Sequence, residues 1–239
     1  MSEGKPFNRW WIVFAAVIIQ LCLGAIYAWS VFRIPLQDQL GISATRASLP
    51  FSIVLIFFAL ATVLGGRLQD KMGPRRVAIL GGVLLAIGMM LASRSHSIGM
   101  LILSYGIISG IGIGFAYVCP ISAGVKWFPD KRGLITGLAV AGFGAGGFFV
   151  APLAAGLISG TPYKLLGAAL FGLPKIGVFQ TFLVLGIAYL VLIVVGGLIL
   201  RNPPAGYVPA GWTPQAAAAS KQAVHYSCTD MLSTGQFWL

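Results

Sequence analysis

Six long stretches without a charged side chain limit the folds that this sequence can adopt. A helix needs about 20 mostly apolar residues to cross the hydrocarbon core of a bilayer, with a range of about 17 to 25. Strands of a membrane β-barrel alternate in polarity, whereas these stretches are apolar on every face. We therefore expect an all-α membrane protein with transmembrane helices over Trp10–Phe32, Ala47–Gly66, Val77–Ser93, Gly99–Val125, Gly133–Ser159 and Ile176–Leu200.

The composition indicates that lipid is the solvent of this protein. Of 239 residues, 58% are hydrophobic and 9% are charged, against roughly a quarter charged in a soluble domain. The net charge of +11 would suggest nucleic-acid binding if the basic residues formed one patch. They lie instead between the apolar stretches, where basic loops set membrane topology and contact lipid head groups. We expect membrane lipid, and no nucleic acid, as a partner.

The basic residues divide unequally between the two sides of the expected bundle. If the N-terminus is cytoplasmic, the other side receives only five of the 16 Lys and Arg, namely Arg33, Arg46, Arg94, Lys164 and Lys175. The positive-inside rule then predicts a multi-pass protein of the cell (inner) membrane with a cytoplasmic N-terminus. The first stretch is too long for a signal peptide and lacks a small-residue cleavage site, so it is expected to be a retained span.

Composition divides the chain into three parts. Residues 1–200 are expected to form a six-helix transmembrane bundle. Residues 201–231 begin with Arg-Asn-Pro-Pro and continue as a polar, alanine-rich stretch that is typical of a cytoplasmic linker. Residues 232–239 turn apolar again and are interpreted as the start of an incomplete seventh helix. We therefore expect the natural chain to continue, or its gene to be interrupted.

The loop between the second and third expected spans carries a distinctive charge pattern. Gly66–Arg76 has the sequence GRLQDKMGPRR, in which Gly73 permits a tight reversal and Asp70 can accept bonds from a helix N-terminus. The pattern resembles the signature loop of the major facilitator superfamily. The resemblance implies a conformational latch between two helical bundles, made by Gly66, Asp70, Lys71, Gly73, Arg75 and Arg76. The alternative is that these charges only set topology.

Three further segments narrow the resemblance. Gly110–Pro120 has the sequence GIGIGFAYVCP, Lys126–Gly133 has KWFPDKRG, and Gly142–Gly147 has GFGAGG. Together they resemble the oxalate/formate antiporter branch, relatives of the monocarboxylate transporters, over nearly the whole chain. The resemblance implies the N-terminal bundle of a major facilitator fold whose C-terminal six-helix half is missing.

The glycines in these segments have the spacing of helix-packing residues. Gly110 with Gly114, and Gly142 with Gly146, each fall on one helix face and allow membrane helices to approach closely. A nucleotide-binding loop would need a strand before it and an acidic residue beyond it, and the sequence offers neither. Pro120 removes a backbone donor within the fourth span. The resulting kink either serves a rocking motion or only shapes the packing.

Candidate substrate-binding residues lie at mid-span, because carriers bind their cargo near the bilayer midplane. The resemblance implies that Tyr27, Trp29, Tyr117 and Phe143 face the cavity. The tyrosine hydroxyls would donate to a carboxylate, and the rings would form a slot for a small planar anion. Packing between helices is the alternative for each of them. Gln20, the amide of the first span, is either a further cavity group or a partner in a helix–helix hydrogen bond.

The expected spans contain no charged residue, so they cannot neutralise a carboxylate substrate. The resemblance implies that basic groups of the second half do so, since intramembrane charges mark substrate paths. The fourth span also lacks the arginine that many proton antiporters of the superfamily carry. The leading hypothesis is transport of small organic anions, such as oxalate, formate or lactate, by alternating access. The alternatives are another cargo (nitrate, a sugar or an amphiphilic drug) or an inactive truncated fragment.

Enzyme chemistry and bound cofactors are not expected. The spans contain no Ser-His, carboxylate-pair or metal constellation that an intramembrane enzyme would need. The three cysteines are an odd set without disulfide or metal-ligand spacing, and neither histidine has a Cys, Asp or Glu partner at ligand spacing. These residues are Cys22, Cys119, Cys228, His96 and His225.

Overall fold

The computed structural model describes residues 7–204, 206–209, 230 and 233–235. Its contacts divide the chain into two units, Met1–Ala205 and Gly206–Leu239. In the described part, six helical segments are long and apolar enough to cross a membrane: Trp10–Leu40, Ala44–Met72, Pro74–Ala92, Ile98–Trp127, Arg132–Ser159 and Val178–Ile199. The prediction of six transmembrane helices is confirmed. The linker and seventh-helix predictions fall mostly outside the described residues and stay predictions.

The first span consists of three consecutive helical segments. Helix α1 (Trp10–Gly24) tightens into the 3₁₀ segment η1 (Ala25–Ala28), which continues as α2 (Trp29–Leu40). The helix ends where Gly41 adopts a left-handed φ of +62°, a conformation that costs glycine little. The span therefore continues past the expected end at Phe32, because the charged residues that end the apolar stretch do not break a helix.

The second and third spans meet at a single glycine. Helix α3 (Ala44–Met72) begins after Ser43, whose hydroxyl accepts a bond from the amide of Arg46. It ends at Gly73, with φ +82°, and Pro74 opens α4 (Pro74–Ala92) as its first residue, a position where proline is favoured. Most of the signature loop is thus helical rather than a loop, since nothing in it stops a helix before Gly73.

The fourth span widens near its start. The short helix α5 (Ile98–Leu101) passes into the π-helical segment η2 (Ile102–Ser109), and α6 (Gly110–Trp127) completes the span. The buried hydroxyl of Ser109 donates to the carbonyl of Leu85 in α4, 3.3 Å away. A Cβ on Gly88 would lie 2.6 Å from the carbonyl oxygen of Ser104. The glycine therefore allows α4 to pack tightly against the π-helical turns.

The last two spans are separated by a β-hairpin that the sequence analysis did not predict. Helix α7 (Arg132–Ser159) is followed by β1 (Tyr163–Leu165), β2 (Ala168–Phe171) and then α8 (Val178–Ile199). The strands are antiparallel, and the two turn residues, Leu166 and Gly167, both have positive φ, as a tight hairpin turn requires. The hydroxyl of Tyr163 donates to the carbonyl of Phe149 at 3.4 Å and attaches the hairpin to α7.

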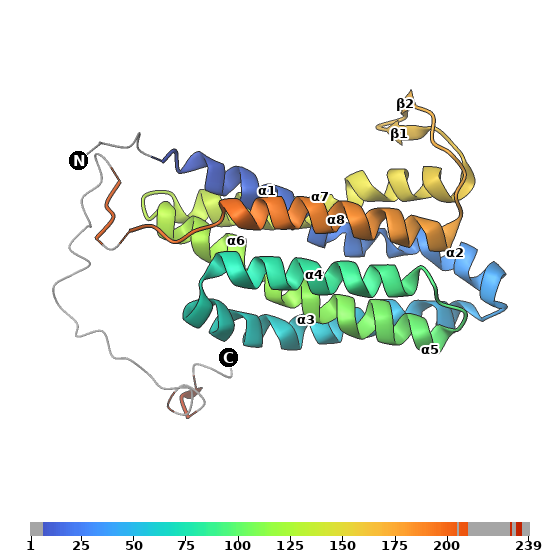
Figure 1. Ribbon diagram of the computed structural model, residues 1–239, viewed down its shortest axis with the longest axis horizontal. Coiled ribbons are helices and arrows are strands. Elements are labelled where there is room, and N and C mark those ends of the chain that lie inside the picture. Colours follow the sequence, from blue (N-terminus) through green and yellow to red (C-terminus); the bar gives the residue numbers. More distant parts are fainter. Residues whose placement is uncertain (1–6, 205, 210–229, 231–232, 236–239) are drawn as a thin grey trace. The chain divides into compact units, whose positions relative to one another are not determined.

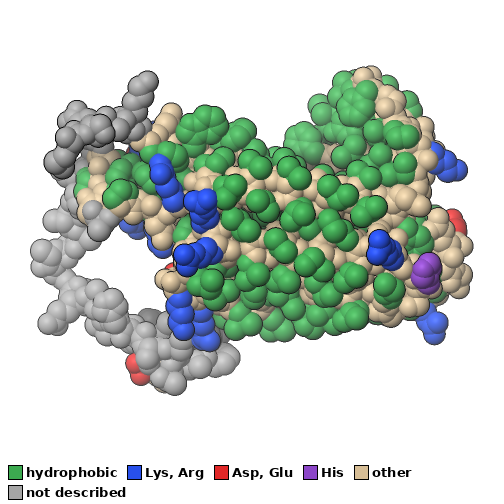
Figure 2. All heavy atoms as spheres, viewed as in Figure 1, with side chains coloured by type: hydrophobic (Ala, Val, Ile, Leu, Met, Phe, Trp, Pro, Cys, Tyr) green, Lys and Arg blue, Asp and Glu red, His purple; other side chains and the backbone are tan. Residues whose placement is uncertain are grey.

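Helix α6 lies at the centre of the Met1–Ala205 unit. It packs against α1, α3, α4 and α7, while α8 packs against α1 and α4, and the helices run roughly side by side (Figure 1). Hydrophobic side chains cover the middle of the bundle, and Lys and Arg gather toward its two ends (Figure 2). This distribution is that of a multi-pass membrane protein.

Candidate functional site

Three of the aromatic residues expected in the cavity lie together. The ring of Phe143 in α7 has its centroid 5.4 Å from that of Tyr27 in η1 and 4.9 Å from that of Tyr117 in α6. Phe58 of α3 completes the group, 5.2 Å from Tyr117 and 5.7 Å from Phe143. We call these four residues the aromatic cluster. It joins the first, second, fourth and fifth spans.

Close helix contacts position the aromatic cluster. Gly24 lies so near the backbone of Phe143 that a Cβ there would overlap it, which brings the next turn of the first span, with Tyr27, beside Phe143. A Cβ on Gly114 would lie 2.7 Å from the carbonyl oxygen of Phe58. The same α3–α6 contact brings Tyr117 beside Phe58. Small residues thus let the backbones approach until the large rings meet.

The aromatic cluster forms part of an open face of the bundle. Tyr27 is 49% exposed, and Tyr117 and Phe58 are partly exposed, whereas Phe143 is buried behind them. Tyr27 and Tyr117 meet Phe143 with interplanar angles of 76° and 71°, the edge-to-face geometry that aromatic rings prefer. The cluster therefore presents parts of Tyr27, Tyr117 and Phe58 at the surface of the bundle, in front of the buried Phe143.

Trp29 lies apart from the aromatic cluster. It is 4% exposed, and its indole N–H donates to the carbonyl of Ala47 in α3 at 3.1 Å. Its ring stacks on Tyr105 with centroids 4.6 Å apart and neighbours Phe182 at 6.3 Å. These contacts place Trp29 in the interior of the bundle, where it ties the first span to the second, fourth and sixth.

Gln20 is fully buried in the first span. Neither polar atom of its side-chain amide has a hydrogen-bond partner among the described residues. A Cβ on Gly142 of α7 would lie 3.5 Å from the Cβ of Gln20, so the amide belongs to the α1–α7 contact. A buried amide without partners is costly, and Gln20 is therefore a polar group with unused hydrogen-bonding capacity.

The remaining packing glycines lie at helix contacts. A Cβ on Gly110 would meet the carbonyl oxygen of Val54 in α3 at 3.0 Å, and one on Gly146 would lie 2.7 Å from Cα of Gly24 in the first span. Pro120 is buried within α6, which continues as a helix on both sides of it. Gly110 and Gly114 thus serve the contact with α3, and Gly142 and Gly146 serve the contact with α1.

The structure divides the predicted latch residues between different surroundings. Asp70 is exposed and accepts a 3.1 Å hydrogen bond from the amide of Gln69, which also donates to Ser122 of α6 at 2.8 Å. Lys71 and Arg67 line an open pocket of about 270 Å³ beside Phe115. Of the other members, Gly66 lies within α3, Gly73 separates α3 from α4, and Arg75 and Arg76 are exposed in the first turn of α4.

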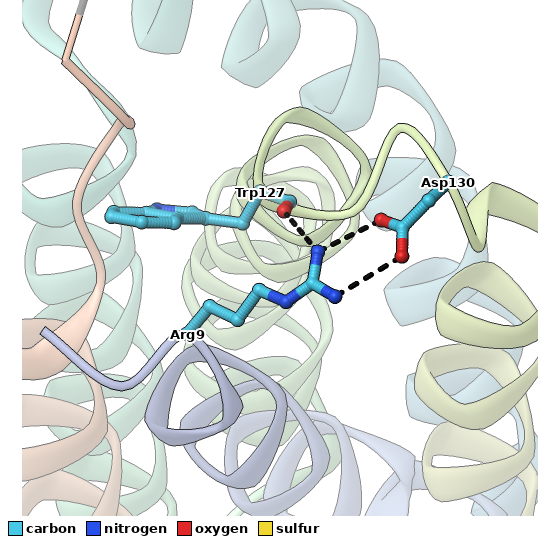
Figure 3. A network of polar contacts seen from close by, with 3 residues as sticks. All are labelled: Arg9, Trp127 and Asp130. Carbon is cyan, nitrogen blue, oxygen red and sulfur yellow. Dashed lines mark hydrogen bonds and ion pairs between the residues drawn. The ribbon is translucent and has the colours of Figure 1, made fainter. Parts of the chain in front are cut away.

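An ion pair that the sequence analysis missed joins the N-terminal segment to the α6–α7 loop. The guanidinium of Arg9 donates to both carboxylate oxygens of Asp130, at 2.8 and 3.1 Å, and to the carbonyl of Trp127 at 3.4 Å (Figure 3). It also lies over the ring of Phe128, 4.3 Å from the centroid. These hydrogen bonds hold the pKa of the Asp130 carboxyl below its usual value.

A comparison with known families identifies the fold. The family model described as Major Facilitator Superfamily matches residues 8–237. The chain belongs to the major facilitator superfamily. This superfamily comprises transporters rather than enzymes.

Relatives within the superfamily include carriers of small carboxylates. The chain is 29% identical to the oxalate:formate antiporter of Oxalobacter formigenes, over 100% of this chain and 52% of that protein. It is also 29% identical to apicoplast pyruvate carrier 1 of Toxoplasma gondii, over 86% of this chain and 47% of that protein. This chain therefore spans about half the length of these relatives.

A solved structure supports the fold. A bacterial homologue of the human lysosomal transporter Spinster, in an inward-facing and unoccupied conformation, superposes with a TM-score of 0.66 at 19% identity. The match covers 89% of this chain and 47% of the other. At this identity the similarity shows the major facilitator fold alone.

Proposed function

We propose that this chain acts as the N-terminal half of a carrier that transports small organic anions, of the oxalate, formate or lactate type, by alternating access. The aromatic cluster carries the proposal, because it gathers residues of four spans on one open face of the bundle. In a carrier built from two six-helix halves, the substrate binds between the halves near the midplane. The known carboxylate carriers among the relatives support this class of substrate.

The chemistry of the cluster suits a small carboxylate. The hydroxyls of Tyr27 and Tyr117 can donate to carboxylate oxygens, and such charge-assisted bonds are stronger than neutral ones. The positive rims of aromatic rings attract electron-rich oxygens, while the ring faces fit a planar anion. Gln20, with both polar atoms unpartnered among the described residues, is an additional donor if the α1–α7 contact opens during transport.

A second six-helix half would supply the positive charge. In the described spans, Lys and Arg lie toward the helix ends, as Arg33, Arg46 and Lys71 do, and not beside the aromatic cluster. An anion in the cluster would therefore be desolvated without a counter-charge, which is costly. We place the basic groups in the other half of a carrier that is about twice as long, as the relatives are.

We further propose a cytoplasmic N-terminus in the cell membrane and a latch role for the signature loop. The basic residues around Gly73 would then face the cytoplasm, as the positive-inside rule requires. Asp70 is exposed at the end of α3, and the neighbouring pocket lined by Arg67 and Lys71 is open to a helix of the second half.

Flux measurements on the complete carrier test the proposal. Proteoliposomes containing both halves should accumulate labelled oxalate, formate, lactate or pyruvate with saturable kinetics. Unlabelled carboxylates should compete, while nitrate, glucose and a cationic amphiphile should not. Transport of any of the latter compounds, without flux of any small carboxylate, would reject the substrate class but leave the fold untouched.

A further inference from the structure

A pocket with two arginines lies at the end of the bundle that carries the N-terminal segment. It encloses about 340 Å³ and is lined by Phe7, Trp11, Arg75, Leu198, Ile199 and Arg201. These residues come from the start of the first span, the start of α4 and the end of α8. The pocket is therefore separate from the aromatic cluster, and Figure 2 shows Lys and Arg gathered at this end of the bundle.

The arginine at the end of α8 is held in place by two contacts. The guanidinium carbon of Arg201 lies 3.4 Å from the centroid of the Phe7 ring, a cation–π contact. The backbone carbonyl of Arg201 accepts a 2.7 Å hydrogen bond from the indole of Trp127. A guanidinium positioned in this way loses less conformational entropy when it binds an anion.

The acidic groups near this end of the bundle are engaged elsewhere. Among the described residues, Asp130 pairs with Arg9, and Asp70 accepts a hydrogen bond from Gln69. In the described part of the chain, the residues that line the pocket include no carboxylate. Two guanidinium groups without a carboxylate among the lining residues favour an anionic ligand, and arginine matches phosphate oxygens well.

An apolar stripe on α8 leads into the pocket. Val184, Ile187, Val191, Val195 and Leu198 are all exposed and recur at helical spacing along one face. Leu198, the last of them, also lines the pocket beside Ile199. In a membrane this stripe faces acyl chains. A lipid whose acyl chain lies along the stripe would therefore have its headgroup at the pocket.

We propose that this pocket binds an anionic phospholipid of the leaflet on the N-terminal side, with Arg75 and Arg201 on the phosphate and an acyl chain along the α8 stripe. Trp11 lines the rim, the position that amphipathic aromatic rings take at the membrane interface. Basic pockets between helix ends are suited to lipid headgroups. The apolar continuation along Leu198 and Val195 favours a lipid over free phosphate.

Native mass spectrometry of the full chain in detergent tests the proposal with three probes: phosphatidylglycerol, phosphatidylcholine and inorganic phosphate. The double variant Arg75→Gln/Arg201→Gln should raise the dissociation constant for phosphatidylglycerol about thirtyfold, given the usual contribution of each basic residue. The matched double variant Arg46→Gln/Arg94→Gln removes the same charge from exposed positions at the other end of the bundle. It should leave the constant within about twofold of the parent.

A second variant separates lipid from free phosphate. Leu198→Asn keeps the two arginines but interrupts the apolar stripe, so it should weaken phosphatidylglycerol binding severalfold. If both double variants weaken phosphatidylglycerol binding equally, the lipid is attracted to positive charge in general and not to this pocket, and the proposal is overturned. Equal affinity for phosphatidylcholine and phosphatidylglycerol, or unchanged lipid binding in Leu198→Asn, would overturn it as well.

Discussion

Substitution of Tyr117 can separate its proposed substrate-binding hydroxyl from the packing of its ring. Tyr117→Phe keeps the ring packing against Phe58 and Phe143 but removes the hydroxyl proposed to donate to the substrate. Loss of a hydrogen bond to a charged group costs about 1.5 to 3 kcal/mol, so the KM for a carboxylate should rise roughly 10- to 100-fold. Initial-rate uptake of labelled substrate by the complete carrier measures this change.

Tyr163→Phe is the matched control for that substitution. It also removes one phenolic hydroxyl, but from the hairpin, where the group donates to Phe149. Its KM should equal that of the parent. If both variants or neither change the KM, Tyr117 has no direct role in binding the substrate.

The ion pair between Arg9 and Asp130 should stabilise the fold. The side chains are 23% and 17% exposed, so the pair is only partly screened by water. Asp130→Asn should therefore lower the free energy of unfolding by about 1 to 2 kcal/mol, measured as a lower thermal midpoint in detergent. Asp38→Asn, at an exposed position of α2, should leave the midpoint unchanged.

The pH dependence of this difference follows from the lowered pKa of Asp130. The folded state holds the carboxyl ionised below its ordinary pKa, so the stabilisation is complete above about pH 4 and is lost as the pH falls through the lowered value. The midpoints of the parent and Asp130→Asn should differ by a constant amount from pH 5 to 7 and converge only in stronger acid. If the two midpoints already converge near pH 6, the ionised carboxylate of Asp130 is not the source of the stabilisation.

Sequence reasoning located part of the candidate site. The family resemblance pointed to Tyr27, Tyr117 and Phe143, the last two of them within quoted motifs, and the structure brings the three together. Phe58 was missed because it lies in a uniform apolar stretch where nothing distinguishes it from packing residues. Arg9 and Asp130 are 121 positions apart, and only the packing of α1 against α6 and α7 makes them partners.

At the scale of elements, α7 offers a direct test of glycine packing. Gly146→Ala would place a Cβ 2.7 Å from Cα of Gly24, and such overpacking typically costs about 1 to 3 kcal/mol. Gly144→Ala, two residues earlier, meets nothing within 4 Å and should be neutral. Thermal midpoints and the yield of monodisperse protein in detergent should fall for the first variant alone. Equal midpoints and yields for the two variants would show that the close α1–α7 contact does not limit the stability of the fold.

The elements were predicted well where apolar length alone decides them. Helix ends were less predictable, because the ends of a span lie in water and need not be apolar. Helix α3, for example, continues through charged residues as far as Gly73. The β1–β2 hairpin was missed because its turn, Leu166-Gly167, resembles a flexible loop in sequence. Strand β1 also contacts α7, where Tyr163 donates to Phe149, and the local sequence does not show this contact.

At the scale of the molecule, α3 and α7 are among the helices that present large apolar side chains outward. On α3 these include Leu55, Ile56, Leu60, Val63 and Leu64, and on α7 they include Val140, Phe148 and Phe149. Lipid can cover such faces, but the aromatic cluster between α3 and α7 includes the exposed Tyr27 and the partly exposed Tyr117, whose hydroxyls acyl chains cannot hydrogen-bond. This surface is what we expect if, as proposed, a second helical half covers the face between α3 and α7.

If the proposed function is correct, the 239-residue chain alone should catalyse no saturable uptake. The proposed site would then lack an opposite wall, and its described residues supply no counter-charge for an anion. Co-expression with a six-helix C-terminal half, taken from the complete carrier, should restore uptake and allow co-purification through a tag on either half. A second half with its mid-span basic residues replaced by Gln should still co-purify but should not transport. Saturable carboxylate uptake by the purified chain alone would contradict the division of roles between the halves.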